Sequence, residues 1–508
     1  MPAKIFAASI FGFDCRLVEV EVDILNGPAS ITIVGLGDAS VQESKERIRS
    51  AIKNSGFEYP RRKKTINLAP ADLRKHGPMF DLPIALGLLL QSGQIPQNCL
   101  EKTVVVGEVS LSGGLRRIPG VLTMVSHGAR EGFTSAIIPA ANAPEASLVS
   151  GIDVIPASDL QSVVAHLRGE EKIPPYQSVE NLGDVAAATD ELWHFEDIRG
   201  HEYVKRALTI AAAGGHNVLL YGPPGSGKTL LARSFQSILP PLSFEEAVEV
   251  TKIYSVAGKL SPGISLIHAP PFRAVHHTAS NISLVGGGSI PRPGEISLAH
   301  KGVLFLDELL EFPRASLDCL RQPMEDGMVN VTRVAGSCRF PAEFTLIAAT
   351  NPCPCGYFGD AQKACQCNPG QLQKYRKALS GPLLDRVDLM CYVPRLPFEK
   401  ITTITGTDSS KNIRKKVMVA RQRQHARYGT ATTNGKISSG SVRQHCELSQ
   451  DAFGLLKEAF SKLHYSGRAY YRILKVARTI ADLEDATEIA PHHLAEALQY
   501  KMFDHLPG

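Results

Sequence analysis

An octapeptide at residues 222–229, GPPGSGKT, constrains this chain more than any other feature. It fits the pattern G-x-x-x-x-G-K-[ST], in which backbone N–H groups close around phosphates because the glycines leave room where a Cβ would clash. The apolar run at 217–221 predicts a buried strand before it, and residues 230–235 predict the start of a helix after it. This context favours a nucleotide phosphate site over the alternative, a glycine turn that binds nothing.

Two side chains in the octapeptide have specific predicted roles. Lys228 would reach the β- and γ-phosphates of ATP, and the Thr229 hydroxyl would help to hold Mg²⁺. ATP and Mg²⁺ are therefore the expected cofactors. The full set of predicted nucleotide contacts in this segment is Gly222, Pro223, Pro224, Gly225, Ser226, Gly227, Lys228 and Thr229.

Length and composition predict a soluble protein of several domains. A chain of 508 residues is too long for a single core, and roughly two to four domains are expected. The net charge of +5 is too small to identify a partner by itself. The first residues lack the apolar segment of a signal peptide, and the apolar run at 82–90 is too short to span a membrane. We therefore expect a cytoplasmic protein without a membrane partner, whose ten cysteines are thiols or metal ligands rather than disulfides.

Polar residues suited to ATP hydrolysis end two further apolar runs. The run at 302–306 ends in Asp307 and Glu308, which predicts a buried strand with two carboxylates at the edge where ligands bind in open α/β sheets. Asp307 would help to hold Mg²⁺, and Glu308 would polarise the attacking water. A structural salt bridge is the alternative for such acids. The run at 344–350 ends in Asn351, which is suited to position water beside the γ-phosphate.

Taken in order, these segments resemble the motifs of AAA+ ATPases. In that family the position of Asn351 is called sensor 1, and the segment at 383–389 carries an arginine, here Arg386, that projects into the neighbouring subunit's nucleotide. An ordinary pairing of Arg386 with a nearby aspartate is the alternative. Arg468, at the start of a predicted helix, fits the sensor 2 position. The resemblance also makes Ile198 and His201 candidates to contact the adenine.

The N-terminal 168 residues resemble the Lon-protease-like domain of the ComM/YifB group of magnesium-chelatase-like proteins. Active proteases of that fold place a serine nucleophile just after a Gly-Pro pair, with a lysine as base. Here Met79 and Phe80 occupy that place, and neither can be a nucleophile. Peptidase activity is therefore not expected, and neither Lys64 nor Lys75 is expected to be catalytic. The segments that carry the resemblance are 35–37, 67–72, 77–78 and 81–85.

The resemblance covers essentially the whole chain and implies an α/β multidomain fold. It divides the chain into a Lon-protease-like (S5-type) N-terminal domain at 1–168, a linker at 169–191, an AAA+ core with β-hairpin inserts at 192–394 and a helical lid at 395–508. The linker would attach the first domain flexibly. The lid is similar to the magnesium-chelatase C-terminal domain. Its arginine-rich stretch at 413–428 is either a solvated helix face or a DNA contact.

Two inserts offer candidate contacts with a partner. Alternation on both sides of Ala-Gly-Ser at 335–337 predicts a hairpin whose tip is flanked by Arg333 and Arg339. In a ring, such arginines would meet DNA phosphates independently of sequence, whereas a solvated hairpin is the alternative. The other insert contains His276, His277 and a triple glycine at 286–288, and it resembles the hairpin of the chelatase and replicative-helicase branch. We expect loop contacts from these histidines rather than metal binding.

A cysteine cluster at 353–367 predicts a structural zinc site. Two C-x-C pairs can place four thiolates on one tetrahedral ion. They lie in a Pro/Gly/Asn-rich loop that needs a cross-link to hold its shape. Unpaired thiols or redox pairs are the alternative. The predicted ligands are Cys353, Cys355, Cys365 and Cys367.

The resemblance implies an ATP-dependent motor that acts on DNA. The expected protein is a ring-forming homo-oligomer, with six subunits as the family expectation. It would be a helicase or translocase that binds single-stranded and branched DNA and promotes branch migration in homologous recombination during natural transformation. The alternative is a magnesium-chelatase-like motor that remodels a protein partner. An ATP-dependent protease, a third possibility, is opposed by Met79 and Phe80.

Overall fold

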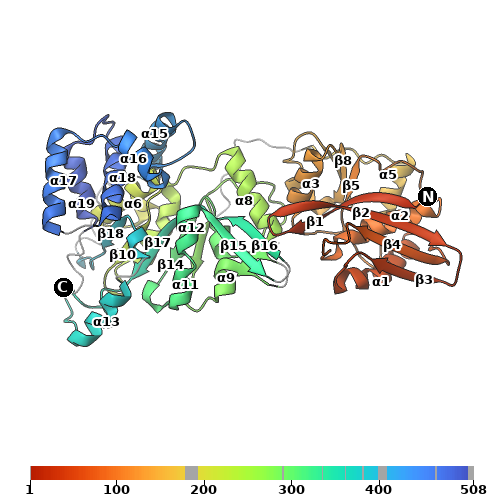
Figure 1. The fold of residues 1–508 in the computed structure, drawn as a ribbon, viewed down its shortest axis with the longest axis horizontal. Helices are drawn as coiled ribbons and strands as arrows, with labels where there is room; N and C mark the ends of the chain where they lie inside the picture. The colour runs from red at the N-terminus through yellow and green to blue at the C-terminus, as the bar shows by residue number, and fades with distance from the viewer. Residues whose placement is uncertain are drawn as a thin grey trace.

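The computed structural model describes residues 2–177, 193–288, 291–333, 336–360, 362–379, 383–398, 409–463 and 466–501 (Figure 1). Most of the predicted linker, residues 178–191, lies outside these ranges. None of the described helices is long and apolar enough to cross a membrane. Figure 1 shows an elongated molecule, with the N-terminal unit at one end, a second sheet in the middle and the C-terminal helices at the other end.

The N-terminal unit is built on a seven-stranded mixed sheet in the order β3-β4-β2-β1-β5-β8-β9. The strands β1, β2 and β4 are antiparallel neighbours, whereas β1, β5, β8 and β9 run parallel. Helix α2 packs against β1 and β2, and nearly all of its residues are buried, so it lies inside the core. The elements are β1 (Ala3–Phe11), β2 (Asp14–Leu25), β3 (Ser30–Val34), α1 (Ala39–Asn54), β4 (Lys63–Ala69), α2 (Asp81–Gln91), β5 (Thr103–Val105), β6 (Glu108–Val109), β7 (Leu115–Arg116), α3 (Val121–Arg130), β8 (Ser135–Pro139), α4 (Ala143–Ala146), β9 (Asp153–Ala157) and α5 (Leu160–Arg168).

The second unit contains a five-stranded sheet in the order β11-β14-β17-β10-β18. All of its neighbouring strands are parallel, and the residues of β10, β14, β17 and β18 are almost completely buried, whereas the edge strand β11 is partly exposed. Short apolar runs buried on both faces are typical of parallel sheets covered by helices. The strands are β10 (Val218–Tyr221), β11 (Phe272–Val275), β14 (Val303–Leu306), β17 (Thr345–Thr350) and β18 (Leu389–Tyr392). Helix α6 (Glu202–Gly214) precedes the first of them, and the helices between them include α7 (Lys228–Ser234), α8 (Phe244–Val256) and α12 (Arg321–Asp326).

Two short antiparallel pairs extend from this unit. The pair β12 and β13 follows helix α9, and the longer pair β15 and β16 runs in register from Met328↔Pro341 to Arg333↔Gly336. Residues 334–335 at the tip of the longer pair lie outside the described part of the chain. The elements are α9 (Asn281–Val285), β12 (Gly286–Gly287), β13 (Arg292–Pro293), α10 (Glu295–Leu298), β15 (Met328–Arg333) and β16 (Gly336–Pro341).

The C-terminal helices pack on α6 and share its hydrophobic core. The arginines of α15 (Ser410–Tyr428) do not form the free basic face expected from the sequence. Arg414 and Arg421 donate to the carbonyls of Ser237 and Ala212 in the second unit, and Arg427 pairs with buried Asp482. Arg414 and Arg421 thus hold this helix to the sheet unit, and Arg427 joins it to another C-terminal helix, whereas Lys415 and Lys416 of the same stretch are exposed. The remaining helices are α16 (Ser439–His445), α17 (Gln450–Leu463), α18 (Gly467–Leu483) and α19 (Pro491–Gln499).

Candidate nucleotide-binding site

Three polar segments meet at one edge of the five-stranded sheet. The loop at 222–229 follows β10, Asp307 and Glu308 follow β14, and Asn351 follows β17. These strands are adjacent and parallel, so their carboxyl ends lie at the same edge. Ligands of open α/β sheets bind at this edge. The segments that the sequence predicted to act together are therefore neighbours in space.

Lys228 opens helix α7 and folds back over the loop. Its Nζ donates to the carbonyl oxygens of Gly222 (2.8 Å) and Pro223 (2.9 Å) and lies 3.3 Å from Oδ1 of Asn351. Burial lowers the pKa of Lys228 to about 8, although Asp307 and Glu308 act in the opposite direction. A phosphate would supply the negative charge that carbonyl acceptors lack, so this buried ammonium suits a triphosphate.

The loop backbone has room for phosphate oxygens. Gly225 and Gly227 adopt positive φ angles of 76° and 92°, which disfavour other residues. A Cβ built on Gly225 would meet nothing within 4 Å, which indicates open space above the loop. Gly222 is constrained differently, because a Cβ there would lie 2.2 Å from the carbonyl oxygen of Val393, the residue after β18. Arg395 donates to the carbonyl of Pro224 (3.2 Å) and holds the loop from outside.

Thr229 and Asp307 form the predicted magnesium position. The Thr229 hydroxyl donates to Oδ2 of Asp307 at 2.9 Å. Both side chains are hard oxygen ligands, and Mg²⁺ is commonly held by one or two such protein groups together with water and phosphate. The donor set therefore fits the ion.

Glu308 lies in a cleft of about 190 Å³ with a partner that sequence reasoning did not assign to it. The residue is in the left-handed region (φ 53°), and its Oε2 lies 3.2 Å from Nδ1 of His277. His277 is the second residue after β11, which lies beside β14, so its position near the end of that strand was the available signal. The cleft is lined by His277, Glu308, Leu310, Glu311, Thr350, Asn351 and Tyr375.

Tyr375, on α13 (Pro369–Leu379), is a second residue of this cleft that the sequence did not single out. Its hydroxyl donates to the backbone carbonyl of Asn351 at 2.8 Å. Burial raises the pKa of Tyr375 to about 12, so the hydroxyl stays protonated and remains a donor. The contact fixes the backbone at the end of β17.

His201 and Ile198, the residues that the resemblance associates with adenine, lie beside the loop. The Nε2 of His201 is 3.9 Å from the position that a Cβ on Gly227 would take. Burial lowers the pKa of His201 to about 4, so the ring is neutral near pH 7. Ile198 is buried in the adjoining hydrophobic core. An apolar side chain and a neutral ring are compatible with a nucleobase.

Arg386 and Arg468 lie together at the opposite edge of the sheet. They line a pocket of about 230 Å³ that also includes Asn217, the residue before β10. Arg386 forms an ion pair with Glu325, and Arg468 lies 3.9 Å from Asp385. The loop at 222–229 follows the other end of β10, so a strand separates the two arginines from the phosphate site of their own chain. The sequence left open that Arg386 pairs with a nearby aspartate. Within one chain Arg386 does form an ion pair, but its partner is Glu325.

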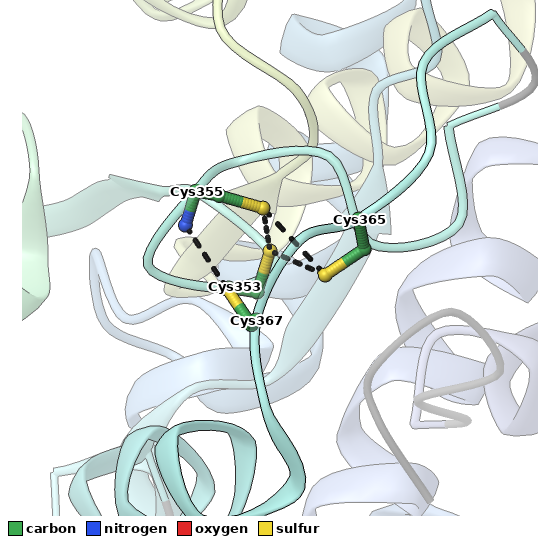
Figure 2. Close-up of side chains that lie close together, drawn as sticks. All are labelled: Cys353, Cys355, Cys365 and Cys367. Atoms are coloured by element: carbon green, nitrogen blue, oxygen red, sulfur yellow. Dashed lines mark hydrogen bonds between the residues drawn. The ribbon is translucent and has the colours of Figure 1, made fainter.

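The four cysteines of the predicted metal site converge in one loop, as Figure 2 shows. The Sγ atoms of Cys353, Cys355 and Cys365 are 3.3 to 3.7 Å apart, and one ligand atom from each of the four residues lies within 4.8 Å of the others. Thiolates on a tetrahedral zinc are about 3.8 Å apart, given Zn–S bonds of about 2.3 Å. Backbone N–H groups of Cys355 and Phe358 donate to Sγ of Cys367 and Cys353, which favours the thiolate form. The donor set therefore fits zinc.

The cysteine loop packs directly against the phosphate loop. A Cβ on Gly356 would lie 2.7 Å from Cδ of Pro224 and 3.9 Å from Cγ of Asn351. Asp360, farther along the cysteine loop, lies 3.5 Å from Arg395, the same side chain that binds the carbonyl of Pro224. The shape of the cysteine loop and that of the phosphate loop therefore depend on one another.

The two arginines predicted to contact DNA lie on the β15–β16 pair. Arg339 is exposed, and its Nε donates to Oδ1 of Asn330 at 3.2 Å. Arg333 ends β15, and its side chain lies outside the described residues. Exposed residues alternate with buried ones along both strands, so the pair has one polar face and one apolar face.

The N-terminal unit lacks a serine–lysine arrangement at the position where the resemblance would place one. Met79 and Phe80 are buried in the core. Lys64 donates to the carbonyls of Pro60 and Arg62, and Lys75 donates to that of Pro70. Both lysines are thus bound to backbone carbonyls.

Three family models match successive parts of the chain. They are described as magnesium chelatase, subunit ChlI (residues 194–401), subunit ChlI of Mg-chelatase (residues 20–142) and magnesium chelatase, subunit ChlI C-terminal (residues 407–501). The second of these lies in the N-terminal unit and the other two in the remainder.

Curated relatives match nearly the whole chain. Competence protein ComM of Haemophilus influenzae is 43% identical over 503 residues, which is 98% of this chain and 97% of the relative. Uncharacterized protein YifB of Escherichia coli is 42% identical over 497 residues, which is 97% of this chain and 96% of the relative. A shorter match, 30% identical over 188 residues, is to Lon protease 2 of Bacillus subtilis and covers 32% of this chain and 33% of that protein.

Proposed function

Because this chain belongs to the ComM/YifB family of magnesium-chelatase-like AAA+ proteins, we propose that it is an ATP-driven motor that moves DNA through a ring of identical subunits. The AAA+ family implies ATPase activity. The observation that carries the proposal is the separation of Lys228, Asp307 and Glu308 from Arg386 and Arg468 by the length of a strand. Each chain thus holds two partial sites, one at the carboxyl ends and one at the amino ends of the strands of one sheet.

Within one chain, the phosphate edge binds and orients the nucleotide. Lys228 and the loop N–H groups would hold the phosphates, while Thr229 and Asp307 would hold Mg²⁺, which neutralises charge on the phosphates when bound. Glu308 would accept a proton from the attacking water, and the Asn351 amide would orient that water. The support for these roles is the hydrogen bonding of Lys228 to Asn351 and of Thr229 to Asp307.

The opposite edge would serve the next subunit. Arg386 and Arg468 line one pocket, and guanidinium groups stabilise the charge that develops during phosphoryl transfer. A contact in which one edge of a subunit meets the other edge of its neighbour is heterologous, and it closes into a ring when the rotation allows. Six subunits is the family expectation.

The proposed substrate is single-stranded or branched DNA. The polar face of the β15–β16 pair, with Arg339 exposed, would contact phosphates without reading sequence. The name of one relative associates it with competence. We therefore assign the motor to branch migration in homologous recombination during natural transformation.

The cysteine loop would hold a structural zinc ion. Four thiolates leave no open coordination position, so the ion would hold the shape of the loop rather than take part in hydrolysis. The support is the convergence of the four Sγ atoms beside Pro224 and Asn351.

A direct test measures ATP hydrolysis by the purified full-length chain with Mg²⁺, alone and with single-stranded DNA, a Holliday-type junction or casein. Stimulation by DNA but not by casein is expected. Glu308→Gln should keep nucleotide binding and lower the hydrolysis rate by about a hundredfold or more. An assembled ring that neither binds DNA nor responds to it would overturn the DNA proposal and favour a motor that remodels a protein partner.

A further inference from the structure

The N-terminal unit contacts the β15–β16 pair through the turn between β1 and β2. This turn consists of Phe11, Gly12 and Phe13, and both phenylalanines pack against the hydrophobic cluster that contains Cys338 and Phe340 of β16. In Figure 1, the end of β1 reaches the β15–β16 pair across the boundary between the two units. The contact joins segments more than 300 residues apart in the chain.

The approach of the two backbones is close enough to require glycine on both sides. A Cβ on Gly12 would lie 2.5 Å from Cβ of Cys338, and a Cβ on Gly336 would lie 2.7 Å from Cζ of Phe11. Both glycines also have positive φ angles, 67° and 131°. Even one added methyl group at Gly12 would therefore have to push the turn and β16 apart.

The turn covers only the apolar face of the pair. Val329, Val331, Cys338 and Phe340 are buried, whereas Asn330, Thr332, Ser337 and Arg339 on the other face are exposed. The pair lies outside the five-stranded sheet, and its strand β15 also contacts α10 and α12 of its own unit. Packing on the apolar face therefore sets where the polar face stands.

A second contact fixes the N-terminal unit on the motor. The Ser255 hydroxyl at the end of α8 donates to Glu145 and accepts from the backbone N–H of Gly120 (3.1 Å), and all three residues are buried. Lys252 of α8 also contacts the Ser126 hydroxyl of α3 at 3.1 Å. The unit therefore has two points of attachment, one on α8 and one on the β15–β16 pair.

From these contacts we infer that Phe11 and Gly12 are positioning residues for DNA binding: the N-terminal unit supports the apolar face of the β15–β16 pair, so that Arg339 on the other face meets the DNA backbone. The inference rests on the proposed function. It gives the N-terminal unit, in which Met79 and Phe80 occupy the place expected for a serine nucleophile, a role in DNA binding. Detaching the turn should weaken the response to DNA without affecting the nucleotide site.

The test compares Gly12→Ala with Gly132→Ala in the full-length protein. Gly132 also lies in the N-terminal unit with a positive φ (86°), but a Cβ there would meet nothing within 4 Å. Both substitutions therefore introduce similar backbone strain, and only Gly12→Ala disturbs the contact with β16. ATP hydrolysis is measured against the concentration of single-stranded DNA, and Arg339→Ala reports the loss of the DNA contact itself.

Gly12→Ala should raise the DNA concentration for half-maximal stimulation about tenfold, while its basal kcat and its KM for ATP stay within about twofold. Arg339→Ala should raise this DNA concentration by a similar factor. Gly132→Ala should behave like the wild type. Adding Cys338→Gly to Gly12→Ala removes the atom that the new methyl group meets, so the combination should recover part of the DNA response. Phe11→Ala provides a second route to the same loss if Gly12→Ala fails to fold.

The outcomes separate the inference from the function on which it rests. A wild-type protein whose ATPase does not respond to DNA would contradict the proposed function. A wild type that responds, an Arg339→Ala variant with a weakened response, and Gly12→Ala and Phe11→Ala variants that respond normally would overturn the inference alone. Equal damage from Gly12→Ala and Gly132→Ala would also overturn it.

Discussion

The imidazole Nδ1 of His277 lies 3.2 Å from Oε2 of Glu308, the carboxylate predicted to polarise the attacking water. His277 also lies in the insert that continues through α9 to the β12–β13 pair. A change in that insert can therefore reach Glu308 through a single side chain. The neighbouring His276 is exposed, and its Nδ1 contacts the Thr278 hydroxyl instead (3.0 Å).

The contact with His277 should orient Glu308 for hydrolysis. His277→Asn removes the ring that contacts Glu308. We expect kcat for ATP hydrolysis to fall about tenfold, which is less than the full contribution of a general base, and KM for ATP to stay nearly unchanged. Steady-state ATPase kinetics measure both constants. His276→Asn is the matched control and should leave both within about twofold. Equal losses in the two variants would show that the double histidine acts through the loop as a whole.

Arg386 and Arg468 should act on a neighbouring subunit's nucleotide. Lys228→Ala and Arg386→Ala are each expected to abolish most ATP hydrolysis. In rings assembled from equal amounts of the two variants, about a quarter of the interfaces combine an intact phosphate loop with an intact arginine, so activity should return toward that fraction. ATPase assays before and after mixing measure this. No recovery in rings shown to be mixed would contradict action across the interface.

The cysteine loop should require zinc to keep its shape beside the phosphate loop. Cys365→Ser removes one ligand, so purified protein should lose its bound zinc and its affinity for ATP should decrease, because Gly356 packs on Pro224. Elemental analysis and nucleotide titration measure the two effects. Cys319→Ser, outside the cluster, is the control and should change neither. Wild-type protein without zinc, purified in the absence of chelators, would contradict the assignment.

Asp388 should stabilise the junction between the sheet and the C-terminal helices in a pH-dependent way. It is buried before β18, where it accepts from the N–H of Asn217 (3.0 Å) and from Arg472 (2.7 Å). Burial alone would raise its pKa, but His216 and Arg472 hold the pKa of Asp388 well below its usual range. Asp388→Asn should therefore lower the free energy of unfolding by about 3 kcal/mol at pH 7.

The sign of the pH dependence follows from the lowered pKa of Asp388. The stabilisation is complete above the pKa of an unfolded aspartate, about 3.9, and is lost as the pH falls toward the folded value. The difference in unfolding free energy between wild type and Asp388→Asn should therefore shrink below about pH 4. Urea unfolding at several pH values measures it. Asp385→Asn, at an exposed position nearby, should change stability by less than about 0.5 kcal/mol at either pH.

The amino-acid sequence by itself determined those features that depend only on residues close together in the chain. The glycines of the phosphate loop, the apolar runs of the parallel strands and the acids after β14 are local patterns, because backbone sterics and strand burial act over a few residues. They were sufficient to predict the phosphate edge and the mixed α/β class. The family was also identified from such motifs and is confirmed by relatives that match nearly the whole length.

Only the tertiary structure decided which distant residues meet. Strand order places the end of β11 beside that of β14, where His277 contacts Glu308, while Arg386 and Arg468 lie at the opposite end of β10 from their own phosphate loop. The arginines of α15 looked like a free basic face because sequence periodicity does not reveal which carbonyls lie opposite. The same holds for Gly12, whose partner Cys338 lies in another unit. Such contacts depend on how whole helices and strands pack against one another, and the spacing of residues along the chain does not predict that packing.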